Sequence, residues 1–314
     1  MATSIQSGLF KLQFKALGTH CVIQFRTDEI AAAKEFKTVA LAWIKDFENT
    51  WSRFKPASLL CKINASAGRE RIPLTQDQDH VMQLCGHTYR QSQGLIDPTS
   101  FPLTQLWDDA AKNNQLPSED EITEVKKRVN WNAVEHSPGS IFLPEKGLAL
   151  EIGGFGKEYA VDRLIDLAKY SGIKNILVDL GRDVAVAGTP PHGPYWVVGA
   201  ENATEEDAAL YRLAITDRAV ATSGNGRRFR TIDGKKFGHI IDSRSGRPAE
   251  TDVLTATCLA PDCLTAGLLS TTACVLGTET GLKEINRHLN TSGIIQTTKG
   301  TRFSSTIHQH ILSS

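Results

Sequence analysis

The segment ALEIGGFGKEYAVDRL, residues 149–164, places a short apolar strand, a run of three glycines and the start of a helix in direct succession. The helical pattern continues to the end of GGFGKEYAVDRLIDLAKYSG (153–172). NILVDLG (175–181) and DVAVAG (183–188) then have the apolar, glycine-bounded composition of short strands. This stretch therefore predicts a strand, helix, strand unit that is followed directly by a further strand.

Strands and helices also alternate on both sides of this unit. FKLQFKALGTHCVIQF (10–25) alternates as strands do, and EIAAAKEFKTVALAWIKDFENTW (29–51) predicts a helix. The apolar face of that helix consists of Ile30, Phe36, Val39, Trp43, Phe47 and Trp51. TQDQDHVMQLCGHTYRQSQG (75–94) predicts a second helix, with Thr75 as its N-cap and Gly94 as its stop.

The last third of the chain repeats this mixture. FGHIID (237–242) predicts a short strand, and DCLTAGLLSTTACVLGTETGLKEIN (262–286) predicts one helix dense in small residues. The mixed order predicts an α+β fold, in which mixed or antiparallel sheets are packed with helices, more than a doubly wound parallel sheet. No low-complexity linker or long repeat divides the chain, so residues 1–314 are expected to form a single domain.

The charge balance narrows the classes of partner. Lysine plus arginine and aspartate plus glutamate both number 35, so nothing in the net charge indicates nucleic acid or a membrane surface. The first residues lack the pattern of a leader, and no apolar stretch is long enough to span a bilayer, so a cytoplasmic location is expected. The six cysteines show no CxxC pairing and are expected to be buried free thiols.

The glycine-rich turn within 149–164 is the first candidate for chemistry. Its glycines let backbone approach a ligand, and the N–H groups at the start of the helix can bind phosphate. Lys157 adds a positive charge suited to a diphosphate. The alternatives are a tight packing turn and a solvated lysine. Glu151 and Asp162 are ambiguous, since each can serve a ligand or complement a helix start.

A second candidate is SGNGRRFRTIDGKKFGHIIDSRSG (223–246), which gathers polar and charged side chains in a hairpin-like stretch: Asn225, Arg227, Arg228, Arg230, His239, Asp242 and Arg244. Arginines bind phosphate and His239 can act as a base. A charged surface hairpin is the alternative. Asp97, before a proline, is either an Asx-turn residue or an acceptor for a ligand. No HExxH, GxSxG or GKS/T pattern occurs.

Taken in order, these segments resemble the ApbE family of FAD:protein FMN transferases from about Phe10 to Asn286. Besides residues 149–164, the segments that carry the resemblance are ALGTH (16–20), WSRFKPASLLCKIN (51–64), IDPTSFPLTQLW (96–107), VDLGRDVAVAG (178–188), YWVVGA (195–200), ATSGNGRRF (221–229), FGHIIDSRSGRP (237–248) and LSTTACVLG (269–277). Each is short, but their order and spacing together make the resemblance specific.

The resemblance implies a fold with an FAD cleft between two halves and a Mg²⁺ ion on the FAD diphosphate. It implies that a threonine or serine hydroxyl of an acceptor flavoprotein attacks the FMN phosphorus and expels AMP. Carried over position by position, the flavin contacts fall on Leu17, Phe54, Leu95, Ile96 and Asp97. Glu151 and Lys157 would lie near the nucleotide, His239 would be the base, and the Gly154 carbonyl and Thr271 would bind the metal.

Three departures from the family pattern bear on the metal. The aspartate expected four residues before Thr271, a direct magnesium ligand, is Gly267. Second, Glu151 stands for an aspartate and Glu158 follows Lys157 in place of a glycine. Third, Arg182 replaces a glycine, and Asn225 and Gly226 replace an aspartate and a tyrosine after Ser223 and Gly224. Losing a carboxylate should weaken a magnesium site, because Mg²⁺ uses few protein carboxylates. A Gly267→Asp variant that gains activity would identify the lost ligand.

Alternative functions therefore remain beside Mg²⁺-dependent FMN transfer. One is a non-catalytic FAD-binding protein that has lost a metal ligand at Gly267, and another is an FAD pyrophosphatase. A third class is an oxidoreductase that uses bound FAD as a redox group and needs no magnesium.

Overall fold

The computed structural model describes residues 3–6, 8–205, 208–226 and 228–313, so Arg227 of the predicted cluster lies outside the described residues. The chain forms two compact units. Unit 1 comprises residues 1–48, 155–223 and 252–314, and unit 2 comprises residues 49–154 and 224–251. Both units are built from separate stretches of the chain.

Unit 1 is built on a nine-stranded sheet whose strand order is also the order of the sequence. Neighbouring strands from β2 to β11 run antiparallel, as do β16, β17 and β18. The strands are β1 (Thr3–Gln6), β2 (Leu9–Ala16), β3 (Thr19–Arg26), β7 (Asn175–Leu180), β8 (Val184–Ala187), β11 (Arg218–Gly224), β16 (Val253–Ala260), β17 (Ser292–Thr297) and β18 (Gly300–Phe303). The predicted α+β class with antiparallel sheets is confirmed.

Helix α1 (Ile30–Trp51) confirms the helix predicted at residues 29–51 and buries part of its predicted face. Phe36, Phe47 and Trp51 are buried, and the Phe36 ring meets Phe25 of β3 edge to face with the centroids 5.1 Å apart. The prediction is wrong for Ile30 and Val39, which are 65% and 39% exposed. Periodicity locates a helix better than it locates the edges of the buried face.

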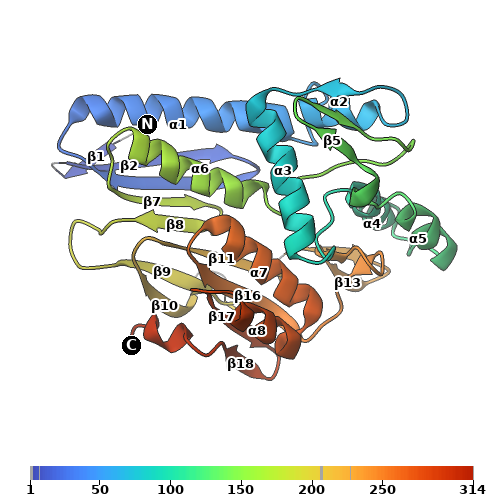
Figure 1. The fold of residues 1–314 in the computed structure, drawn as a ribbon. Coiled ribbons are helices and arrows are strands. Elements are labelled where there is room, and N and C mark those ends of the chain that lie inside the picture. The colour runs from blue at the N-terminus through green and yellow to red at the C-terminus, as the bar shows by residue number, and fades with distance from the viewer. Residues whose placement is uncertain (1–2, 7, 206–207, 227, 314) are drawn as a thin grey trace. The chain divides into compact units, whose positions relative to one another are not determined.

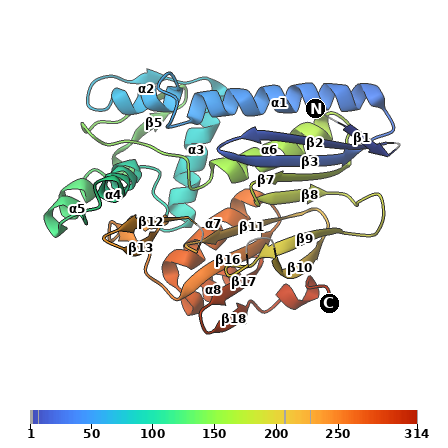
Figure 2. The same ribbon diagram turned by 180° about the vertical axis from the view of Figure 1, so that it is seen from behind.

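Three further helices of unit 1 lie on one face of the sheet (Figures 1 and 2). They are α6 (Gly156–Tyr170), α7 (Cys263–Leu276) and α8 (Thr278–Arg287). The single helix predicted at residues 262–286 is therefore two helices. They meet at Gly277, whose φ of 82° lies in the left-handed region that ends helices.

The hairpin β9 (Trp196–Glu201) and β10 (Ala209–Ile215) packs with the opposite side of the sheet. A buried core joins β9 and β10 to β8, β11 and the 3₁₀ turn η2 (Ile307–Gln309), through residues that include Val186, Trp196, Leu213 and Ile307. After η2 the chain hydrogen-bonds to β10, because Leu312 N donates to Arg212 O at 2.9 Å. Unit 1 thus has apolar cores on both faces of its sheet.

Unit 2 is mainly helical, with short sheets. Its elements are α2 (Leu59–Ala65), β4 (Ile72–Pro73), α3 (Gln76–Gln91), α4 (Phe101–Asn113), α5 (Glu119–Lys126), η1 (Trp131–Ala133), β5 (Glu135–Ser137), β6 (Ser140–Phe142), β12 (Phe229–Ile232), β13 (Lys235–Gly238), β14 (Ile241–Asp242) and β15 (Arg247–Pro248). Thr75 caps α3 as predicted, and its hydroxyl accepts from Gln78 N. The strand predicted at residues 237–242 is interrupted, because His239 and Ile240 separate β13 from β14.

The cysteines agree with the prediction of free thiols. None of the six is part of a disulfide, five are buried, and Cys61 is half-buried. Within the described ranges, none of the helices combines the length and the apolar character that crossing a bilayer requires.

Candidate functional site

In unit 2, Glu151 is held by three side chains, one from the loop after α1 and two from the start of α4. One carboxylate oxygen accepts from Arg53 Nη1 at 3.1 Å, and the other accepts from Ser100 Oγ at 3.1 Å and from the Thr104 hydroxyl. Ser100 and Thr104 belong to the start of α4, so this carboxylate also lies near the positive end of a helix dipole. The predicted Glu151 is therefore a half-buried partner of Arg53, with both oxygens engaged.

The predicted loop at residues 95–97 lies against the glycine-rich segment within unit 2. A Cβ built on Gly154 would be 3.2 Å from Ile96 Cγ2, and Glu151 N donates to Pro98 O at 2.8 Å. Leu95 is buried. The structure thus brings Ile96 together with Glu151 and Gly154, which lie more than fifty positions later in the chain.

Asp97 in this loop has the Asx-turn role. Its Oδ1 accepts from Thr99 N at 2.7 Å and from Thr99 Oγ1 at 2.6 Å, and its Oδ2 accepts from Trp131 N at 3.4 Å. Burial raises the pKa of the carboxyl, while these hydrogen bonds act in the opposite sense. The hydrogen bonds of Asp97 therefore stabilise the conformation of the loop.

Phe54 is 79% exposed, which is unusual for a large aromatic side chain. The neighbouring Arg53 guanidinium lies 4.8 Å from the centroid of the Phe54 ring and 5.4 Å from that of Phe101. Arg53 is therefore fixed by Glu151 and by two rings at once. The exposed ring of Phe54 gives unit 2 an aromatic surface on which a planar ligand can stack.

His239 lies between β13 and β14 with one ring nitrogen oriented by the backbone. Its Nδ1 is 3.1 Å from Arg228 O, and because a carbonyl only accepts, Nδ1 is the nitrogen that carries the hydrogen. In the neutral ring, the lone pair then belongs to Nε2. This tautomer is the one that a general base needs.

The arginines near His239 are divided between ion pairs and solvent. Arg230 donates to Asp108 at 2.8 Å and also reaches His239 O at 3.4 Å. Arg244 makes a two-pronged pair with Asp242, at 3.0 and 2.8 Å, which holds the pKa of that carboxyl below its usual range. Arg228 is exposed. The predicted cluster is thus partly a set of internal ion pairs that shape the hairpin.

In unit 1, the predicted Leu17 occupies a two-residue turn between β2 and β3. Leu17 and Gly18 have φ of 52° and 71°, and this region is unfavourable for a leucine. Glu48 of α1 supports the turn, because its carboxylate accepts from Leu17 N at 3.1 Å. A shallow pocket beside the turn is lined by residues that include Lys15, Thr19, His20 and Glu48.

A second two-residue turn positions a carboxylate in unit 1. Gly181 and Arg182 have φ of 72° and 78°, so β7 returns at once as β8 and Asp183 follows the turn. Asp183 is buried and accepts from the Lys157 ammonium of α6. The predicted Lys157 is therefore paired with a residue from the GRD segment at 181–183.

The predicted Thr271 belongs to a chain of hydroxyl groups on α7 and β11. Ser223 Oγ hydrogen-bonds with Thr271 Oγ1 and with Ser270 Oγ, both at 2.8 Å. Ser270 Oγ in turn donates to Gly267 O at 3.0 Å. Thr271 is one turn beyond Gly267, so these two positions share a face of the helix. Gly154 belongs to unit 2 and Thr271 to unit 1.

Glu158 fills the space beside Gly267. A Cβ built on Gly267 would lie 2.5 Å from Glu158 Cγ and 2.7 Å from its Oε1, distances that real contacts do not reach. Burial, and then the charge of Asp183, raise the pKa of Glu158 to about 7. A Gly267→Asp change alone would therefore collide with Glu158.

Two other carboxylates nearby have structural roles. Asp162 of α6 accepts from the N–H groups of Cys263 and Leu264, at 2.7 and 2.9 Å, and so binds the first turn of α7. Asp262 is the N-cap of the same helix and accepts from Thr265 N at 2.7 Å. Asp162 therefore complements a helix start, one of its two predicted roles.

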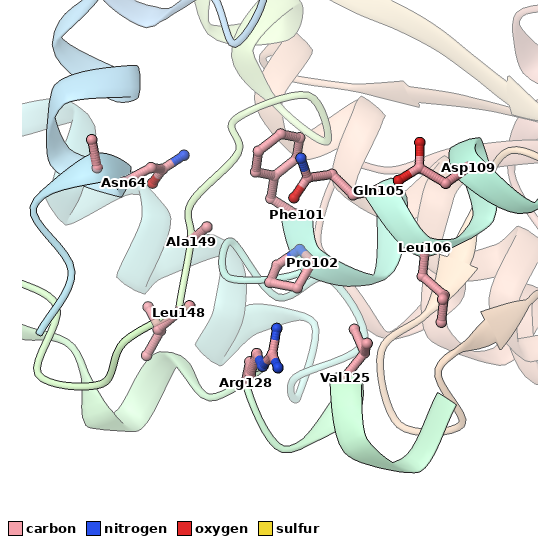
Figure 3. A pocket seen from close by; sticks show the side chains of 12 residues that line it. Asn64, Phe101, Pro102, Gln105, Leu106, Asp109, Val125, Arg128, Leu148 and Ala149 are labelled. Carbon is pink, nitrogen blue, oxygen red and sulfur yellow. The ribbon is translucent and has the colours of Figure 1, made fainter. Parts of the chain in front are cut away.

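An open pocket of unit 2 contains none of the predicted site residues (Figure 3). Polar side chains of Asn64, Gln105, Asp109 and Arg128 lie around it. Asn64 also binds Leu150 in both directions, at 2.9 and 2.7 Å, next to Glu151. The pocket thus borders the segment that carries Glu151.

The described residues contain no group of three or more His, Cys, Asp or Glu side chains that could hold a metal. Unit 1 offers instead the carboxylates of Glu158 and Asp183 and the hydroxyls near Thr271. These are oxygen donors, and Mg²⁺ is commonly bound through one or two carboxylates together with substrate phosphates. The donor set is therefore of the type that fits magnesium.

Structural comparison with known proteins identifies the fold, and sequence comparison then identifies the family. The structure aligns with the ApbE protein of Thermotoga maritima at a TM-score of 0.88, with 25% identity over 97% of this chain and 100% of that one. It aligns with the flavin transferase ApbE of Vibrio cholerae at a TM-score of 0.83, with 22% identity over 99% and 100% of the two chains. The fold is thus that of solved ApbE proteins.

Sequence comparison gives the same result. The FAD:protein FMN transferase of Escherichia coli K12 is 26% identical over 93% of this chain and 85% of its own length. That of Vibrio cholerae O395 is also 26% identical, over 81% and 77%. The sequence model of the ApbE family matches residues 17–295. The chain belongs to the ApbE family.

Sequence reasoning missed several residues that complete these arrangements. Arg53 and Asp183 stand inside recognised segments, yet only the fold shows that they hold Glu151 and Lys157. In the sequence, Ser223 is only part of a polar, hairpin-like stretch. Glu158 and Gly267 each depart from the family pattern, but a single sequence gives no signal of their contact.

Proposed function

We propose that this protein is an FAD:protein FMN transferase that moves FMN from FAD to a threonine or serine hydroxyl of an acceptor flavoprotein, with Mg²⁺ as the metal. The match of residues 17–295 to the ApbE family carries the proposal, because it covers the segments from both units that contain the predicted site. Relatives named FAD:protein FMN transferase support it.

The proposed reaction exchanges the phosphoanhydride bond of the FAD diphosphate for a phosphate ester bond to the acceptor. The acceptor hydroxyl oxygen bonds to the FMN phosphorus, the bond from that phosphorus to the bridging oxygen breaks, and AMP leaves with that oxygen. The hydroxyl proton passes to a base. Magnesium, when bound, neutralises charge on the diphosphate and so supports a transfer in which the phosphoryl oxygens are highly charged.

His239 is proposed as the base. Its Nδ1 donates to Arg228 O, so Nε2 of the neutral ring can take the proton. A fixed tautomer avoids reorganisation at the moment of transfer. Phe54 is proposed to stack on the flavin ring, supported by Arg53 and Glu151, and the Leu95, Ile96 and Asp97 loop and Leu17 are proposed as further flavin contacts.

The phosphate-binding groups come from the glycine-rich turn and α6. Lys157 is proposed to lie near the nucleotide, with its position fixed by Asp183. The Gly154 carbonyl and Thr271 hydroxyl are proposed as metal ligands. Glu151 is proposed to act through Arg53, since its own oxygens are engaged in unit 2.

One assay separates this function from its alternatives. Purified protein is incubated with FAD and an acceptor protein, with and without Mg²⁺, while AMP, FMN and covalent flavin are measured. Magnesium-dependent AMP release with flavin on the acceptor supports the transferase. Free FMN and AMP without covalent flavin indicate a pyrophosphatase. Stable FAD without turnover indicates a binding protein, and bleaching of bound flavin by an electron donor indicates an oxidoreductase.

The role of His239 is tested in the same assay. His239→Ala is expected to reduce flavin transfer by about 10²- to 10⁴-fold, the usual contribution of a general base. FAD binding, followed by quenching of flavin fluorescence, should change little. An unchanged transfer rate would remove His239 from the mechanism.

A further inference from the structure

Glu158 is a carboxylate buried without full compensation. The residue is 6% exposed, and its Oε2 has no hydrogen-bond partner among the described residues. Leaving a buried acceptor unsatisfied is unfavourable, and it is more so for a charged group. An arrangement of this kind in the first turn of α6 requires an explanation beyond packing.

Gly267 of α7 provides the space that Glu158 occupies. The Glu158 carboxyl carbon would be 2.9 Å, and its Oε1 2.7 Å, from a Cβ at position 267. The carboxylate of α6 therefore lies where the first atoms of a side chain on α7 would lie. Any residue other than glycine at position 267 would displace it.

The surroundings of Glu158 carry an excess of negative charge and of oxygen donors. The charged groups that act on it are Asp183, Lys157 and Asp162, of which only Lys157 is positive. On α7, the face of Gly267 continues one turn later with Thr271, whose hydroxyl is bonded to Ser223. Oxygen ligands with net negative charge are the environment that Mg²⁺ prefers.

We infer that Glu158 provides, from α6, the carboxylate oxygen of the magnesium site, in the space left free by Gly267 of α7. The inference rests on the proposed function, which requires a cation beside the FAD diphosphate. Glu158 of α6 thus takes the ligand role that an aspartate at position 267 of α7 would have. In this arrangement the cation compensates the Glu158 oxygen that the protein leaves unpaired.

The test compares variants that carry the carboxylate on α6, on α7 or on neither helix. Glu158→Gln keeps the volume and removes the charge, Glu158→Gly removes the side chain, and Glu158→Gly with Gly267→Asp returns a carboxylate to α7. Mn²⁺, a paramagnetic stand-in, is titrated and followed by electron paramagnetic resonance, with Mg²⁺ as competitor. Asp166→Asn is the matched control, because Asp166 is an exposed carboxylate on the same helix.

Glu158→Gln and Glu158→Gly are each expected to weaken Mn²⁺ binding by about tenfold or more. The double variant should recover most of the affinity lost in Glu158→Gly, while Asp166→Asn binds as the unmodified protein does. Wild-type affinity in Glu158→Gln would overturn the inference and leave Glu158 as a packing residue. So would a double variant that binds no better than Glu158→Gly.

The failure of this inference can be told apart from failure of the proposed function. FAD binding and AMP release are measured on the same samples, and circular dichroism checks that each variant is folded. If the unmodified protein releases AMP with Mg²⁺ and Glu158→Gln keeps its metal affinity, only the assignment of Glu158 is wrong. If the protein neither binds nor cleaves FAD, the proposed function is wrong, and the Mn²⁺ titrations still decide whether Glu158 holds a cation.

Discussion

At the scale of single residues, burial changes the chemistry of the cysteines. It raises the pKa of Cys21 to about 11 and that of Cys274 to about 12, and it also raises the pKa of Cys85, Cys258 and Cys263. A higher thiol pKa means less thiolate at any given pH, and thiolate is the nucleophile. Cys61 differs from the other five cysteines because it is only half-buried.

We expect one fast-reacting thiol in the folded protein. With Ellman's reagent at pH 8, Cys61 should react first and the five buried thiols should react slowly, through opening of the structure. Because their pKa values lie above that pH, raising the pH to 9 should speed their reaction by increasing thiolate. Cys61→Ser should abolish the fast phase. A fast phase that survives in Cys61→Ser would contradict this.

The site residues show what a sequence can predict at this scale. Asp97, Glu151 and Lys157 lie in segments whose composition pointed to function, and the structure places all three in polar contacts. The partners Arg53, Thr99 and Asp183 follow from packing, which a single sequence does not show. Side chains that neutralise one another look like ligand-binding groups until their partners are known.

At the scale of elements, the strongly periodic segments were the predictable ones. Helices α1, α3 and α6 and strands β2, β3, β7 and β8 fall where alternation or helical spacing placed them. The errors occur where one residue interrupts a pattern. Gly277 divides the predicted C-terminal helix, and His239 with Ile240 divides a predicted strand. A period is a property of many residues, whereas a break depends on a single backbone conformation.

The hairpin of β7 and β8 depends on Gly181 for two reasons, its backbone conformation and the lack of space for a side chain. Gly172 is a matched position at which only the first reason applies. Gly181 and Gly172 have φ of 72° and 75°, so alanine is strained at both. At Gly181 a Cβ would also lie 2.4 Å from Thr19 Oγ1, whereas at Gly172 it would meet nothing within 4 Å.

Gly172→Ala is expected to cost about 1 kcal/mol of unfolding free energy from backbone strain alone. Gly181→Ala should cost roughly 1–3 kcal/mol more, because the added methyl group has no space. Urea unfolding of the two variants measures the difference. Equal losses would show that the contact with Thr19 relaxes without cost and that only the backbone conformation matters.

At the scale of the whole molecule, the chain passes between the two units four times. Unit 2 is made of residues 49–154 and 224–251, and both ends of each stretch continue directly into unit 1. The first crossing falls inside α1 and the third follows Ser223 in β11. Neither unit can be cut out as one continuous segment, which supports the proposal of a single domain over residues 1–314.

We therefore expect one cooperative unfolding transition. Folded unit 1 holds the ends of the unit 2 stretches in place. When unit 1 unfolds, those ends are released, and the gain in chain entropy favours the unfolding of unit 2 as well. Labelling with 5-fluorotryptophan gives separate fluorine signals for Trp196 in unit 1 and for Trp107 and Trp131 in unit 2. All should lose native intensity at the same urea concentration. Different midpoints would show two domains that unfold independently.

A core variant of unit 1 is the control for that experiment. Ile307 is buried in the core beside β9 and β10, and Ile307→Ala should cost about 2–5 kcal/mol. In a single cooperative protein this shifts the Trp107 signal as much as that of Trp196. A shift confined to Trp196 would limit the effect to unit 1.

Because neighbouring strands of the large sheet follow one another in the sequence, a ribosome produces them in the order in which they pair. Each strand that leaves the exit tunnel can join the open edge formed by the strand before it. The longest interval separates β3 from β7, which translation at about 5–20 residues per second makes roughly 7–30 s. During that time the nascent β2–β3 hairpin exposes an unpaired edge, so a chaperone that shields strand edges should matter most for this protein while residues 27–174 are being made.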